Sequence, residues 1–319
     1  MAAAAALGGH LSRCGALALL LMAAATAIPA AKAAARVLII EGLAGEPLYA
    51  RQFDAQVQAL AAASRALDGN DAVSVLAGAQ ATRARILGQF RQLTSHMDRD
   101  DELIVYLVGH GSFDGREYKF NVPGPDLSDA DLKAALQPVR AQHQLLIVTG
   151  SASGALLPTL GAPHRVLLTA TRNGDERNVT RFGAALVAAL QSPEADTDKD
   201  GRISAQEAFS YARRSVQEQY RRDGLLASEH AVLQGNEAGG FVLAALTPAA
   251  PVGVPAGRLR RRDALNARIR ALEARKATLA PADYQQRLQD LLLQLARLQQ
   301  QIDQSGPPPA AAGGPHAPP

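Results

Sequence analysis

The chain has 319 residues, and its 33 lysines and arginines against 30 aspartates and glutamates give a formal net charge of +3 at pH 7. A charge so close to neutrality gives no general affinity for nucleic acid, and the length is sufficient for one sizeable α/β domain with appendages. The single cysteine, Cys14, lies in an N-terminal segment that we expect to be removed, which excludes disulfides and a cysteine nucleophile from the mature chain.

Residues 1–33 have the form of a secretory signal peptide. Arg13 supplies a basic start, an apolar run follows over Gly15–Ala27, and Ala31-Lys32-Ala33 has the small-x-small form of a cleavage site. The apolar run is short for a bilayer span, although an uncleaved anchor is the alternative. We therefore expect an exported protein, periplasmic or secreted, with no stable membrane span and with 31 basic and 30 acidic residues after cleavage.

Between residues 34 and 247 the sequence alternates between short apolar runs and helical patterns. The apolar runs are too short for buried helices and predict strands at Arg36–Glu41, Asp71–Leu76, Leu103–Val108, Leu145–Val148 and Arg165–Ala170, with a last edge strand at Gly240–Ala244. Helical spacing predicts helices over Leu48–Ser64, from Thr82 to about Ser95, from Ser128 to Val139, over Arg181–Leu190 and over Ala205–Arg221. This alternation indicates an α/β fold, a three-layer sandwich around a mostly parallel sheet.

Two of the predicted central strands end in small and polar residues. Leu103–Val108 runs into Gly109-His110-Gly111, and Leu145–Val148 runs into Thr149-Gly150-Ser151. The carboxyl ends of central strands are where an open α/β sheet places its chemistry. We therefore expect the imidazole of His110 and the hydroxyl of Ser151 to meet at one edge of the sheet.

Residues 196–207, DTDKDGRISAQE, match an EF-hand calcium loop at every diagnostic position. The expected ligands are Asp196, Asp198, Asp200, the carbonyl of Arg202, and Glu207. The alternative is a solvated acidic turn in which Ser204 and Glu207 only cap a helix. That alternative does not explain three alternating aspartates followed at once by Gly201, so the loop predicts Ca²⁺ as the cofactor, with weak affinity sufficing outside the cell.

The C-terminal part of the chain has a different composition. Residues 248–257 are rich in proline, glycine and alanine and predict a linker. Residues 258–303 carry leucine and isoleucine at spacings of three and four with Pro281 between two runs, which predicts a helical hairpin or coiled coil that packs on itself or self-associates. Its basic cluster, Arg258 and 260–262, is typical of a solvated face rather than of docking to an acidic membrane or partner. Residues 304–319 predict a disordered tail.

The VYLVGHG strand end, the small-residue turn around Ser151, the Ala170-Thr171 turn and the DxDxDG loop together resemble the caspase-like fold of clan CD cysteine peptidases, the bacterial caspase and legumain-like group. The resemblance covers residues 36–245. In that group one strand ends in His-Gly and the next in a pattern such as Asp-Ala-Cys-x-Ser-Gly. The resemblance implies that His110 is the catalytic histidine, that Ser153-Gly154 closes the motif, and that Thr149 stands at the acidic position. It also implies that Ser151 stands where the group has its cysteine nucleophile.

Serine in place of cysteine leaves two interpretations open. A serine hydroxyl does not ionise near neutrality and needs a base within hydrogen-bond reach, so we favour a pseudo-peptidase that binds or scaffolds a protein or peptide partner. The alternative is a hydrolase in which Ser151 attacks, His110 is the general base, and backbone amides near Gly111 and Ser151 hold the oxyanion. No residue that could orient His110 stands out, although Asp114 and Glu117 lie nearby in the sequence.

Overall fold

The computed structural model describes residues 34–246, 256–273, 276 and 279–303. The predicted signal peptide (1–33), most of the linker (248–257) and the tail (304–319) lie outside the described residues. None of the described helices is both long and apolar enough to cross a membrane.

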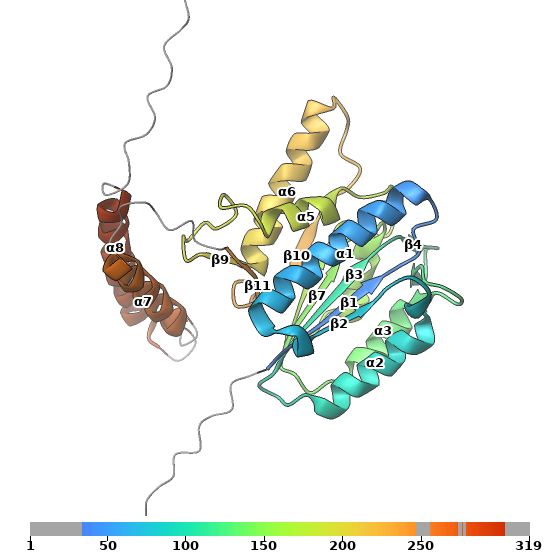
Figure 1. The fold of residues 1–319 in the computed structure, drawn as a ribbon, viewed down its shortest axis with the longest axis horizontal. Helices are drawn as coiled ribbons and strands as arrows, with labels where there is room; N and C mark the ends of the chain where they lie inside the picture. The colour runs from blue at the N-terminus through green and yellow to red at the C-terminus, as the bar shows by residue number, and fades with distance from the viewer. Residues whose placement is uncertain (1–33, 247–255, 274–275, 277–278, 304–319) are drawn as a thin grey trace, which may run out of the picture. The chain divides into compact units, whose positions relative to one another are not determined.

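A six-stranded sheet forms the centre of the domain (Figure 1). Its strand order is β10-β8-β7-β3-β1-β2. The strands are β1 (Ala35–Glu41), β2 (Val73–Leu76), β3 (Glu102–Val108), β7 (His143–Val148), β8 (Arg165–Thr169) and β10 (Val232–Gln234). Five of them run parallel, and only β10 is antiparallel to its neighbour β8.

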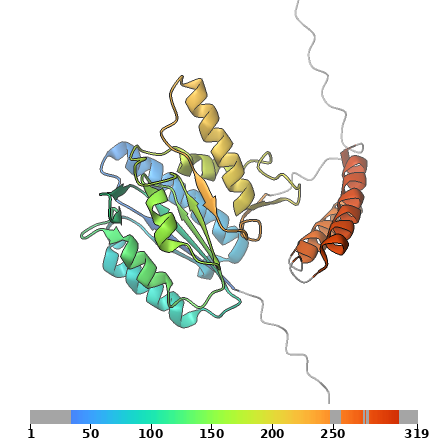
Figure 2. The same ribbon diagram turned by 180° about the vertical axis from the view of Figure 1, so that it is seen from behind.

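Helices cover both faces of this sheet, as the two opposite views show (Figures 1 and 2). The helices on one face are α1 (Pro47–Asp68), α5 (Phe182–Ala189) and α6 (Ala205–Arg222), and those on the other are α2 (Arg83–His96), α3 (Asp129–Leu136) and α4 (Leu156–Leu160). Successive side chains of β1 point to opposite faces of the sheet, so Val37 and Ile39 pack in one core and Leu38 and Ile40 pack in the other. The predicted three-layer α/β sandwich is therefore confirmed.

Capping explains where two helices begin. Thr82 accepts a hydrogen bond from the backbone N–H of Arg85 at the start of α2. Ser128 and Asp131 form a complete capping box at the start of α3, as their spacing predicts.

The prediction of a last edge strand at Gly240–Ala244 is wrong about the sheet that it joins. Val242–Ala245 forms β11, which pairs with β9 (Arg202–Ser204) in a separate two-stranded sheet. The late strand that does lie at an edge of the main sheet, opposite β2, is β10, a three-residue strand too short for its alternation to be recognised. The sequence also gave no signal for a small sheet of β4 (Gly111–Phe113), β5 (Tyr118–Phe120) and β6 (Leu127–Ser128).

The C-terminal segment is a pair of helices, α7 (Ala256–Glu273) and α8 (Pro281–Asp303). Leu265, Leu272, Leu291, Leu298 and Ile302 form a buried cluster between them. Helix α7 begins two residues inside the segment that the sequence predicts as linker.

Candidate active site and calcium loop

The two residues expected at the sheet edge follow neighbouring parallel strands. Strands β3 and β7 pair in register, with Leu107 opposite Val148. His110 follows β3 by two residues and Ser151 follows β7 by three, so both segments leave the sheet at its carboxyl edge. Both residues line one small pocket together with Phe53 of α1.

Two aromatic rings and a backbone carbonyl hold the imidazole of His110. The rings of Tyr49 and Phe53 lie edge-on to it, each with its centroid 5.0 Å away. The His110 Nε2 atom lies 3.1 Å from the carbonyl oxygen of Ala44. A carbonyl can only accept a hydrogen bond, so Nε2 carries a proton, and in the neutral form of the ring Nδ1 keeps its lone pair. This tautomer leaves one ring nitrogen able to accept a proton.

The group that orients His110 is therefore the main chain between β1 and α1. The carboxylate of Asp114 is engaged elsewhere, because it accepts the N–H groups of Arg116 and Glu117 at 2.9 Å. A backbone carbonyl has no signature in the residue types, so sequence reasoning could not identify Ala44.

Ser151 lies in a tight and almost fully buried turn. Its neighbour Ala152 adopts a left-handed conformation with φ of 54°, and the Ala152 N–H donates to the carbonyl of Glu176 at 2.8 Å. A Cβ on Gly150 would approach the Gly109 carbonyl to 2.4 Å, so this close approach of the two strand ends requires glycine. Among the described residues, the Ser151 hydroxyl makes no hydrogen bond to His110.

The residues around Ser151 serve to hold the turn. Thr149, at the position implied to be acidic, donates its hydroxyl to the Leu107 carbonyl at 3.3 Å. Thr171 accepts the N–H of Gly154 at 2.9 Å, and its hydroxyl lies 3.3 Å from that of Ser153. Ser153 and Gly154 thus fasten the turn to the end of β8.

The loop at 196–207 gathers carboxylates around one point. Single oxygens of Asp196, Asp198 and Glu207 all lie within 4.8 Å of one another. Asp196 is 5% exposed, and the backbone N–H groups of Asp200 and Gly201 donate to its two oxygens at 3.1 and 3.0 Å. Gly201 has φ of 80°, the sharp turn that position six of such a loop needs.

The electrostatics of the loop fit a cation. Burial and the neighbouring carboxylate of Asp200 raise the pKa of Asp198 to about 6. Burial also acts to raise the pKa of Glu207, but hydrogen bonds from Ser204 and Thr197 outweigh it and leave that pKa below its usual value. Oxygen donors crowded in a loop are what Ca²⁺ requires, so Asp196, Asp198 and Glu207 would hold the ion, and a bound cation would neutralise their mutual repulsion.

The loop at 196–207 and the pocket of His110 lie toward opposite ends of β3. The charge of Arg202 in the loop acts on Glu102, the first residue of β3. His110 follows the last residue of the same strand, roughly 25 Å away at about 3.3 Å per residue. An ion in the loop would therefore be structural rather than part of the pocket.

The strand order and the strand ends define a three-layer α/β protein with a histidine and a small-residue turn at the carboxyl edge of its central sheet. The profile of the Peptidase C13 family matches residues 60–234, more than half of the chain, and the chain belongs to that family. The match contains His110, Ser151 and the loop at 196–207, and it ends before the hairpin.

No curated protein matches the chain. Among solved structures, the crystal structure of caspase-1 from Spodoptera frugiperda is similar at 9% sequence identity, covering 67% of this chain and 91% of that chain with a TM-score of 0.41.

Proposed function

We propose that this member of the Peptidase C13 family is an exported, calcium-binding pseudo-peptidase that binds or scaffolds a protein or peptide partner. The observation that carries the proposal is the identity of residue 151 and its lack of a hydrogen bond to His110. Ser151 follows β7 where the family resemblance implies a cysteine, and its hydroxyl is not hydrogen-bonded to His110. A serine whose hydroxyl is not hydrogen-bonded to a base is a poor nucleophile, whereas a thiol paired with histidine could ionise near neutrality.

The surroundings of the pocket support a binding role. Leu43 and Leu48, which are 47% and 50% exposed, precede and follow Ala44 in the sequence, and the Ala44 carbonyl contacts His110. Val179, 38% exposed, lines the pocket itself. Apolar side chains exposed beside a small polar pocket suit an apolar peptide segment.

A hydrolase that uses Ser151 and His110 is the second candidate, and the tautomer of His110 favours it. The Ala44 carbonyl keeps the proton on Nε2, which leaves Nδ1 as the base that serine chemistry needs. The backbone amides of Gly111 and Ser151 would then stabilise the oxyanion.

A fluorophosphonate probe separates the two candidates. We expect the chain from residue 34 onward to remain unlabelled, because an unactivated serine does not attack phosphorus. Labelling of the unmodified protein at Ser151 that disappears in His110→Ala would establish the hydrolase and overturn the proposal.

A cysteine variant tests whether the remaining site is intact. Residues 34–319 contain no cysteine, so Ser151→Cys introduces a single thiol beside His110. We expect iodoacetamide to alkylate this thiol near neutral pH, and more slowly once His110 is replaced by alanine. Ser153→Cys is the matched control, since Ser153, unlike Ser151, does not line the pocket of His110 and lies buried against Thr171, so a thiol there should resist alkylation.

A further inference from the structure

Charge is distributed unequally between the α/β domain and the C-terminal pair of helices, α7 and α8. Residues 258–303 contain ten lysines and arginines and five aspartates and glutamates, whereas residues 34–247 contain 21 and 25. The hairpin is therefore basic and the α/β domain acidic. The net positive charge of the hairpin favours an acidic binding partner.

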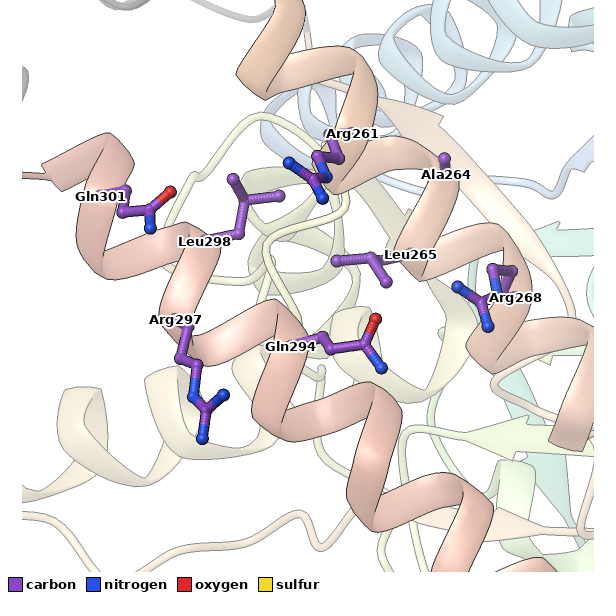
Figure 3. Close-up of a pocket in the computed structure, with 8 residues that line it drawn as sticks. All are labelled: Arg261, Ala264, Leu265, Arg268, Gln294, Arg297, Leu298 and Gln301. Atoms are coloured by element: carbon purple, nitrogen blue, oxygen red, sulfur yellow. The ribbon is translucent and has the colours of Figure 1, made fainter.

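A groove runs between α7 and α8 on one side of the hairpin (Figure 3). We name it the arginine groove, and its volume is about 300 Å³. The lining residues that matter here are Arg261, Leu265, Arg268, Gln294, Arg297 and Leu298. Figure 3 shows Leu265 and Leu298 facing each other between the helices, with two arginines on α7 and one on α8.

The arginines of this groove have no acidic partner among the residues that the structure describes. The ion pairs of the described residues do not include Arg261, Arg268 or Arg297. Among the side chains that the structure describes, no carboxylate lines the groove, and the other polar side chains there are neutral glutamines such as Gln294. Three guanidinium groups around an apolar floor are complementary to carboxylates carried beside an apolar side chain.

The spacing of the arginines on α7 suits a helix. Arg261 and Arg268 lie seven residues apart on α7, which corresponds to about 10.5 Å along the axis. Carboxylates seven residues apart on a partner helix would have the same spacing. A cleft between two packed helices is the place where a third amphipathic helix docks in bundles and in helix-in-groove complexes.

We propose that the arginine groove binds an acidic amphipathic helix of another protein. A second copy of the hairpin would bring the same arginines and repel the first. A membrane surface fits less well, because Leu265 and Leu298 are only 7% and 6% exposed and cannot insert into lipid. The inference concerns a different surface from the Ser151 pocket and stands whether or not Ser151 reacts.

The test uses the chain from residue 34 to 319 and a fluorescent peptide of about 20 residues with glutamate at seven-residue spacing and leucine between. A scrambled peptide of the same composition is the control ligand. We expect binding of the patterned peptide to be at least about tenfold tighter than that of the scrambled one. The triple variant Arg261→Gln, Arg268→Gln, Arg297→Gln should lose that difference while circular dichroism shows unchanged helicity.

A matched variant controls for net charge. Arg91→Gln, Arg214→Gln, Arg221→Gln removes three exposed charges from α2 and α6, and it should bind the patterned peptide like the parent chain. Equal affinity for the two peptides, or equal loss in both triple variants, would overturn the proposal. The proposal would also be overturned if the chain co-sedimented with vesicles containing about one third phosphatidylglycerol and did not bind the patterned peptide, because that result assigns the groove to membranes.

Discussion

Adding calcium should stabilise this protein through the loop at 196–207. In the absence of an ion, Asp196, Asp198 and Glu207 present oxygens within 4.8 Å of one another, and burial with Asp200 raises the pKa of Asp198 to about 6. A carboxyl whose pKa is raised on folding costs stability once the pH exceeds its unfolded value near 4. Calcium binding to the ionised form offsets that cost, so its stabilising effect should be full above about pH 7 and should decline as the pH falls through about 6.

The magnitude follows from linkage. Extracellular calcium modules bind with dissociation constants of roughly 10⁻⁴–10⁻³ M, so about 10 mM calcium exceeds the constant by roughly 10- to 100-fold. The corresponding stabilisation is about 1.4–2.7 kcal/mol. For a domain of this size, that gain raises the melting temperature by roughly 3–11 °C.

Differential scanning fluorimetry with and without calcium measures this shift. The informative variant is Asp198→Ala, because Asp198 makes only a local hydrogen bond to the N–H of Asp200, whereas Glu207 also caps α6. Asp100→Ala, an exposed acid outside the loop, is the matched control and should keep the full shift. A melting curve that does not move with calcium in the parent chain, or a shift that survives Asp198→Ala together with Glu207→Ala, would remove the metal from the proposal.

Two further predictions concern the stability of the α/β domain. Burial and the nearby charge of Asp68 raise the pKa of Glu102 to about 7, so the folded state loses stability as the pH rises from about 4.5 to 7. In urea titrations, the free energy of unfolding of Glu102→Gln should exceed that of the parent by roughly 1–3 kcal/mol at about pH 8 and should equal it at about pH 4. Gly154→Ala would place a Cβ 2.2 Å from the backbone of Arg172 and Asn173, and should cost roughly 1–3 kcal/mol, whereas Gly239→Ala meets nothing within 4 Å and should be nearly neutral.

The fold could be predicted where a segment is long and its pattern is unambiguous. The run at 103–108 and its neighbours are apolar on both faces because helices cover the sheet on both sides, and that burial is visible in composition alone. The three-residue strands β4, β5 and β10 carry too few residues to show alternation. Their pairing depends on chain segments that only tertiary structure brings together.

The candidate site was likewise predictable only in part. The meeting of His110 and Ser151 at one sheet edge followed from strand order, because parallel neighbours must end on the same side. The partner of the imidazole could not be predicted, since it is the main-chain carbonyl of Ala44 rather than any side chain. The edge-on rings of Tyr49 and Phe53 were also missed, because at the sequence level they appear only as part of a helical apolar face.

EF-hand loops ordinarily occur in pairs, which raises the question of what packs against the loop at 196–207. Ile203, at position eight, lies in β9, and β9 pairs with β11, so a strand from the end of the domain takes that place. The hydrogen bond from the Leu246 N–H to the Gly201 carbonyl, at 2.8 Å, continues this connection. Calcium in the loop would therefore fix the start of α6 and the last strand before the hairpin at once. An ion far from the pocket of His110 would thus secure the point where the chain leaves the α/β domain.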